Sequence, residues 1–212
     1  MRGVKYDEVK GSPLGRLKPH SLNGLDNFKE TVAIFGDSNF YGYGLKDKQM
    51  LHNVLKTERI VNNFAYPSEG NIHIFRKMVD IFSEYGFPST VLVCWSSHLR
   101  VPVVREHNGN QQKSIGTWTR DLWDYDKLGW PDDVAGTVEF IEKAPLSLRH
   151  ISIDIIKGTR LMLKNVNYME WTCHIQDDDL NIPQLPFIDN TTFDNHPGPK
   201  TIRNLAEVIG VL

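Results

Sequence analysis

The 212-residue chain contains only two cysteines and no long apolar run. Cys94 and Cys173 lie near the ends of expected strands, where a small buried thiol is the usual occupant, so we expect neither a disulfide nor a metal site there. The N terminus lacks the apolar core of a signal peptide, and no segment is apolar for long enough to span a bilayer. The sequence therefore predicts a cytoplasmic protein without a membrane partner.

An excess of charge of one sign is also missing. The formal net charge is −2 and the isoelectric point is about 6.4, which removes the electrostatic footprint of a general nucleic-acid binder, although a local basic patch would escape this count. With 40% hydrophobic and 24% charged residues, the chain has the balance of a globular domain with one sizeable core. We expect no nucleic-acid partner, and the sequence does not indicate an oligomeric state.

Recognisable cofactor signatures are absent as well. Gly36, Gly42 and Gly44 fit neither the dinucleotide fingerprint nor the phosphate-binding P-loop, and Asp177–Asp179 lacks the alternation of a calcium loop. Most of the histidines are scattered without ligand spacing, namely His52, His73, His107, His150 and His174. We therefore expect no cofactor and no metal.

The chain does contain an alternation of apolar, β-type runs and amphipathic segments. The expected strands cover residues 31–36, 59–64, 90–95 and 168–173, and the expected helices cover 46–56, 71–85, 146–164 and 199–209. Strands separated by helices imply a doubly wound, mostly parallel sheet with right-handed crossovers. The predicted fold class is α/β, a three-layer α/β/α architecture of the flavodoxin-like kind.

Two stretches depart from this alternation. Residues 1–30 are polar and broken by glycine and proline, which predicts an irregular N-terminal arm before one domain at 31–212. Residues 101–144 are rich in Gly, Asp and Trp and lose the pattern, which predicts an irregular insertion. Its tryptophans are Trp118, Trp123 and Trp130. The insertion is interpreted either as a lid over the functional edge or as a satellite apolar cluster on the surface.

The most informative segment runs from Val32 to Gly44. It is a short apolar run that ends in Gly36-Asp37-Ser38, so Ser38 lies at the carboxyl end of an expected buried strand, where open α/β sheets keep their sites. A serine nucleophile needs a positioned base with a carboxylate behind it, and Asp194-Asn195-His196 supplies both. The alternative is that Asp37 or Ser38 only caps the next segment, while Asp194 caps the terminal helix and His196 is a surface residue.

Together these segments resemble the SGNH (GDSL-type) hydrolase family, in which the serine lies in an N-terminal Gly-Asp-Ser block and the Asp and His lie near the C terminus. The resemblance implies that Ser38 is the nucleophile, His196 the base and Asp194 the acid, with Asp189 in reserve. The commonest family spacing is Asp-x-x-His, whereas position 193 is Phe193. Some members use Asp-x-His, as here.

The resemblance also implies an oxyanion hole. Its donors would be the backbone N–H of Ser38 and that of Ser68, which takes the place of a family glycine, with Gly70 as the nearby substitute. The alternative for this loop is a turn in which Ser68 or Asn71 caps the next helix, which is compatible with either function.

The third family block, Gly-x-Asn-Asp, is replaced by the segment Trp95–Arg100. His98 matches the missing asparagine best by position, and the other donors considered are Ser97, Arg100 and Asn71. Loss of one donor typically lowers the rate by about 10²–10³-fold, so catalysis would be weakened but not excluded. The alternative for His98 is a loop histidine whose polar atoms are satisfied by the backbone.

The resemblance implies a metal-independent esterase that hydrolyses a small O-acyl or acetyl group on a carbohydrate or similar polar molecule. Transfer of the acyl group to another alcohol is a second activity open to the same site. A third hypothesis, from a different class, is a non-catalytic binding or structural module that kept the fold. A compact, variant domain of this kind is similar to proteins encoded by large bacteriophages, for which the virion would be an expected location.

Overall fold

The computed structural model describes residues 25–67, 69–105, 111–115, 139–172, 180–191 and 196–210. Within them, four parallel strands form the central sheet in the order β2-β1-β3-β6. Their bounds are Val32–Gly36 for β1, Val61–Asn63 for β2, Thr90–Trp95 for β3 and Asn167–Thr172 for β6. The predicted parallel α/β sheet is confirmed.

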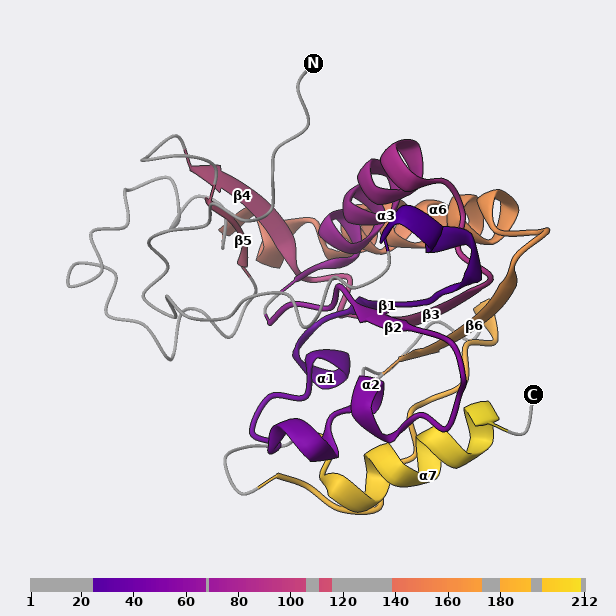
Figure 1. Cartoon of the computed structure of the whole chain (residues 1–212). Coiled ribbons are helices and arrows are strands. Elements are labelled where there is room, and N and C mark those ends of the chain that lie inside the picture. The colour runs from indigo at the N-terminus through magenta and orange to yellow at the C-terminus, as the bar shows by residue number, and fades with distance from the viewer. Residues whose placement is uncertain are drawn as a thin grey trace.

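Helices cover both faces of this sheet (Figure 1). One face carries α3 (Asn71–Tyr85) and α6 (Pro145–Met162), and the other carries α1 (Ser38–Tyr41), α2 (Leu51–Val54) and α7 (Pro199–Gly210). Successive residues of a strand point to opposite faces, so β3 sends Val91, Val93 and Trp95 to the first core and Leu92 and Cys94 to the second. The result is the three-layer α/β/α architecture that the alternation predicts.

The central strands are almost entirely apolar because both of their faces are covered. Every residue of β1 and β3 is buried, as expected for strands inside a parallel sheet. Cys94 of β3 is buried, in agreement with the expectation from sequence, whereas Cys173 lies outside the described residues. In the described part of the chain, no helix has both the length and the apolar character needed to cross a membrane.

The sequence predicts one continuous helix at 46–56, and this prediction is wrong. The chain instead forms the short 3-10 helix η3 (Asp47–Gln49) and then α2, separated by Met50 in an extended conformation (φ −71°, ψ 150°). The amide of Asn53 donates to the Asp47 carbonyl oxygen at 2.8 Å, a side-chain bond that supports a turn in place of a continuous helix.

The stretch expected to be irregular contains regular structure that the sequence pattern did not reveal. Strands β4 (Val101–Arg105) and β5 (Gln111–Ile115) form an antiparallel pair that lies beyond the end of β3 (Figure 1). Strand β4 contains a proline and strand β5 is largely polar. Neither strand therefore has the uninterrupted apolar run or the alternation by which a strand is recognised in a sequence. The three tryptophans named above lie outside the described residues.

The expected N-terminal arm is described only at its end. Residues 1–24 lie outside the described part, and Leu25–Glu30 form the 3-10 helix η2. Phe28 in this helix is buried in the core beneath α3, with its ring 6.2 Å from the ring of Phe64. The last residues of the expected arm are therefore part of the domain.

Candidate active site

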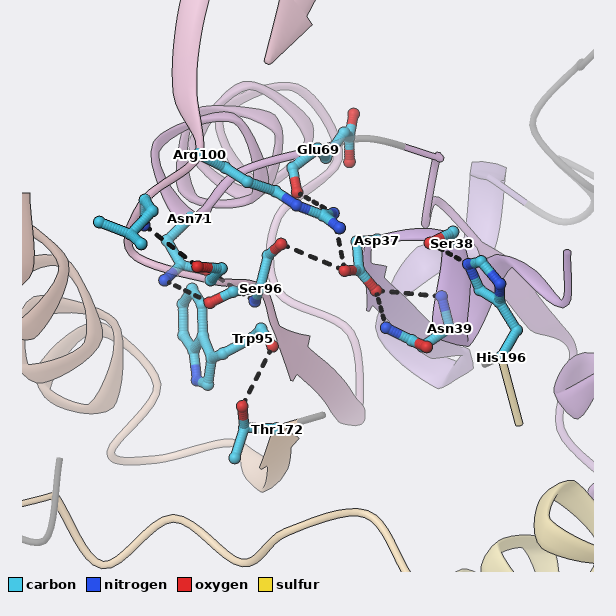
Figure 2. A network of polar contacts seen from close by, with 12 residues as sticks. Asp37, Ser38, Asn39, Glu69, Asn71, Trp95, Ser96, Arg100, Thr172 and His196 are labelled. Atoms are coloured by element: carbon cyan, nitrogen blue, oxygen red, sulfur yellow. Dashed lines mark hydrogen bonds and ion pairs between the residues drawn. The ribbon is translucent and has the colours of Figure 1, made fainter. Parts of the chain in front are cut away.

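Ser38 and His196 meet at the carboxyl edge of the sheet although 158 positions separate them in sequence. Ser38 is the first residue of α1 and is separated from the end of β1 only by Asp37, and His196 lies shortly before α7. The His196 Nε2 atom is 2.9 Å from the Ser38 Oγ atom, a hydrogen bond shown in Figure 2. This distance is the geometry required of a serine nucleophile and its general base.

Local sequence explains the placement of Ser38. Asp37 has an extended conformation and caps α1, because its Oδ1 atom accepts a hydrogen bond from the Asn39 backbone N–H at 3.0 Å. Gly42 ends the helix with a left-handed φ of 88°, which favours glycine. The capping interpretation of Asp37 is therefore correct, and it coexists with the contact between Ser38 and His196.

The imidazole of His196 also has an aromatic neighbour. The ring centroid of Tyr43 is 5.2 Å from that of His196, with an angle of 45° between the planes. The Tyr43 backbone N–H donates to the Ser38 carbonyl oxygen at 3.1 Å, so the segment that carries the tyrosine is tied to the serine. Tyr43 therefore limits the orientations open to the imidazole, a role that the sequence did not reveal.

Two carboxylates were considered as the acid behind His196. Asp194 lies outside the described residues, so its role stays a prediction. Asp189 accepts hydrogen bonds from the backbone N–H groups of Thr201 at 2.8 Å and Lys200 at 3.0 Å, and from the Thr201 hydroxyl. Desolvation opposes ionisation of Asp189, but these hydrogen bonds and the Lys200 charge outweigh it and lower its pKa. Asp189 therefore anchors the start of α7, and Asp194 stays the first choice for the acid, with Asp189 in reserve.

Asn71 does not serve the oxyanion hole, contrary to one of the alternatives from sequence. Its Oδ1 atom accepts from the Ser96 N–H at 2.7 Å, and its Nδ2 atom donates to the Ser96 carbonyl at 3.0 Å and to the Ser152 hydroxyl. These bonds fasten the end of β3 to α3. Asn71 also does not cap α3, because the N-cap residue is Gly70 and no side chain caps it.

The other predicted donors are Ser68, Gly70 and His98. Ser68 lies outside the described residues, whereas Gly70 is buried at the start of α3. His98 is half-buried in a turn that is closed by a 3.2 Å hydrogen bond from the Arg100 N–H to the Ser97 carbonyl. Donation by any of them to an oxyanion stays a prediction.

A buried ion pair lies beside Ser38. The Arg100 Nη1 atom is 2.9 Å from the Asp37 Oδ2 atom, and the two side chains are 13% and 0% exposed. The Ser96 hydroxyl donates to the same oxygen at 3.1 Å, and the Asn39 amide donates to Oδ1 at 2.7 Å (Figure 2). A buried carboxylate requires such partners, so the location of Asp37 after a buried strand was the signal from which a cationic partner could have been expected.

Glu69 adds a second, titratable charge next to this pair. Burial raises its pKa to about 7; the ammonium group of Lys77 opposes the rise through its charge and hydrogen bond, and the Asp37 carboxylate adds to it. Lys77 pairs with the Glu69 carboxylate and donates to the Phe64 carbonyl at 2.8 Å. The charge beside Asp37 and Arg100 therefore changes near neutral pH.

Gly70 is required for space and not for its backbone conformation, which is an ordinary extended one (φ −95°). A Cβ atom at this position would lie 2.5 Å from the Arg100 carbonyl oxygen and 2.9 Å from the Arg100 Cβ atom. We expect Gly70→Ala to displace the turn after β3 and to lower the free energy of unfolding by about 1–3 kcal/mol. Urea denaturation measures this change.

Gly158 provides the matched control for this prediction. It lies in the interior of α6, and a Cβ atom there would have no neighbour within 4 Å. Gly158→Ala should therefore stabilise the protein by about 0.5–1 kcal/mol through helix propensity. Equal effects of the two substitutions would contradict the steric account of Gly70.

Among the described residues, no group of three or more His, Cys, Asp or Glu side chains is arranged to hold a metal ion. No family model matches the chain, and no curated protein matches its sequence.

Solved structures of similar proteins have low identity to the chain. A G-D-S-L family protein from Desulfitobacterium hafniense DCB-2 matches at 13% identity and a TM-score of 0.40, covering 85% of this chain and 98% of that one. The psychrotrophic esterase EstA from Pseudoalteromonas sp. matches at 14% and 0.40, covering 86% and 96%. A lipolytic G-D-S-L family member from Veillonella parvula DSM 2008 matches at 13% and 0.37, covering 84% and 94%.

Proposed function

We propose that this protein is a serine ester hydrolase with Ser38 as nucleophile and His196 as general base. The observation that carries the proposal is the 2.9 Å contact between the Ser38 Oγ and His196 Nε2 atoms at the carboxyl edge of a parallel sheet. A turn that served only to cap a helix would not require a histidine from the other end of the chain at this distance. The resemblance of Gly36-Asp37-Ser38 to the SGNH hydrolase block supports the same function.

The first half-reaction forms an acyl-enzyme. The Ser38 oxygen attacks the ester carbonyl carbon while His196 takes the hydroxyl proton, and a C–O bond to the serine forms. As the tetrahedral intermediate collapses, the bond to the alcohol breaks and His196 returns the proton to the leaving oxygen. Asp194 is the proposed acid that orients the imidazole and stabilises its charged form.

Water completes the reaction in the second half. His196 removes a proton from water, the resulting hydroxide attacks the acyl carbon, and the serine leaves with that proton. The products are a carboxylic acid and a free enzyme, so atoms and charges balance. With an alcohol in place of water the same site would transfer the acyl group, because the acyl-enzyme is common to both reactions.

The developing oxyanion requires hydrogen-bond donors. The Ser38 N–H is one candidate, since the first amides of a helix have no partner inside the helix. The N–H of Ser68 or Gly70 and the His98 side chain are the others. The substrate class that we propose is a small O-acyl ester on a carbohydrate or similar polar molecule.

Covalent labelling with a fluorophosphonate tests the proposal, because this reagent reacts with serines that a base has activated. We expect one adduct, located on Ser38 by peptide mass mapping. Ser38→Ala should remove the adduct, and His196→Ala should slow its formation by at least about 10²-fold. Ser83→Ala is the control, since Ser83 is an exposed serine on α3 whose hydroxyl donates to the Val79 carbonyl.

The same experiment distinguishes the alternative. An unlabelled but folded wild-type protein would contradict the hydrolase proposal and favour a non-catalytic binding module. Labelling of serines other than Ser38 at comparable rates would also contradict it.

A further inference from the structure

The segment that replaces the family asparagine brings a cation to the nucleophile. Ser96, the first residue after β3, is fastened to Asn71 through both its N–H and its carbonyl. The turn that follows is closed at Ser97, which accepts from the Leu99 N–H through its hydroxyl and from the Arg100 N–H through its carbonyl. This rigid turn directs the Arg100 side chain back to Asp37 (Figure 2).

Arg100 contacts both segments that carry backbone donors for the proposed oxyanion hole. Its Nη1 atom donates to the Asp37 carboxylate at 2.9 Å and to the Glu69 carbonyl at 3.3 Å. Asp37 precedes Ser38, and Glu69 lies between Ser68 and Gly70. One nitrogen atom therefore links the nucleophile turn to the loop that precedes α3.

The link to the nucleophile is short and buried. The Asp37 carboxylate accepts from Arg100 through Oδ2 and from the Asn39 N–H through Oδ1, so the residues on both sides of Ser38 are held by one side chain. A movement of Asp37 would therefore displace the Ser38 backbone. A misplacement of about 1 Å at a reacting group can lower a rate by about 10²-fold.

We propose that Arg100 is a positioning residue that fixes the Ser38 turn and the 69–70 backbone relative to each other. It replaces the missing asparagine by pre-organising backbone donors, and it does not itself donate to the oxyanion. This inference rests on the proposed hydrolase function. It assigns to Arg100 a role different from that of a direct donor, which was one of the alternatives from sequence.

The test compares Arg100 variants in fluorophosphonate labelling and in hydrolysis of 4-nitrophenyl acetate. Arg100→Met should lower kcat and the labelling rate by about 10²-fold and leave KM within about threefold, because the geometry of the reacting groups changes and the binding surface does not. Arg100→Lys keeps the charge and should retain activity within about tenfold of wild type. Thermal unfolding checks that each variant is folded.

Arg160→Met is the matched control. Arg160 of α6 forms an ion pair with Glu170 of β6, with the Arg160 Nε atom 2.7 Å from the carboxylate. Its replacement should lower stability without changing kcat. A similar loss of kcat in both variants would show a general effect of destabilisation and overturn the proposal.

A double variant decides the outcome if Arg100→Met does not fold. Arg100→Met with Asp37→Asn removes both charges and leaves no unpaired buried ion, which favours folding. If the folded double variant is labelled slowly, the positioning role of Arg100 is supported. If it is labelled as fast as the wild-type protein, that role is overturned. If the reagent labels Ser38 equally fast in the wild-type protein and in Arg100→Met, only the Arg100 proposal fails. If the folded wild-type protein is not labelled, the hydrolase function fails and the Arg100 proposal fails with it.

Discussion

Ser38→Ala is expected to lower kcat for the hydrolysis of 4-nitrophenyl acetate by about 10⁴–10⁶-fold, because no other group would form the acyl-enzyme. His196→Ala should cause a loss of similar size, since the serine hydroxyl would then have no base at 2.9 Å. Steady-state kinetics of the two single variants and the double variant provide the measurement.

The double variant distinguishes a catalytic pair from two independent residues. Residues that act as a unit give losses that do not add, so the double variant should be about as slow as either single variant. A multiplicative loss would contradict the proposed pairing of Ser38 and His196. Circular dichroism checks that each single variant is folded. If one of them does not fold, the kcat of the other single variant decides whether the proposed catalytic role is correct.

Asp37→Asn is expected to lower the free energy of unfolding by about 3–5 kcal/mol, because it leaves the Arg100 guanidinium partly buried without its counter-charge. The Asp37 side chain is fully buried, so solvent cannot replace the lost interaction. Urea denaturation with two spectroscopic probes measures the change and tests whether unfolding stays two-state.

Asp47→Asn is the control for this prediction. Asp47 is an exposed acid in the short helix η3, so its substitution should change stability by no more than about 0.5 kcal/mol. An effect of Asp37→Asn below about 1 kcal/mol would mean that the ion pair contributes little. The Arg100 proposal would then lose its structural basis.

Local patterns determined much of the fold. The 3.6-residue period in 71–85 predicts α3 with its observed bounds, and the apolar run at 90–95 predicts β3. These elements are recognisable because the apolar residues that become buried follow a regular pattern within one short segment. The pair β4 and β5 was missed because its residues carry no such periodic signal.

The chemistry of the site was predicted only in part. The Gly36-Asp37-Ser38 block and the C-terminal His196 were identified from residue type, position after a strand and family resemblance, and the structure brings Ser38 and His196 together. The parts that failed concern polar side chains with several possible partners. The sequence suggests Asn71 as an oxyanion donor, whereas its partners are the Ser96 backbone just after β3 and the Ser152 hydroxyl of α6.

The sequence by itself determined the parallel α/β architecture and singled out Ser38 and His196 as candidate nucleophile and base, because apolar periodicity and residue chemistry are local properties. Only the tertiary structure decided that Arg100 pairs with Asp37, that Asp189 anchors α7, and that Gly70 must leave space for the Arg100 carbonyl. Each of these depends on which segments the parallel sheet places side by side. Hydrogen bonds and close contacts between segments that are distant in the sequence do not produce a periodic pattern of residue types.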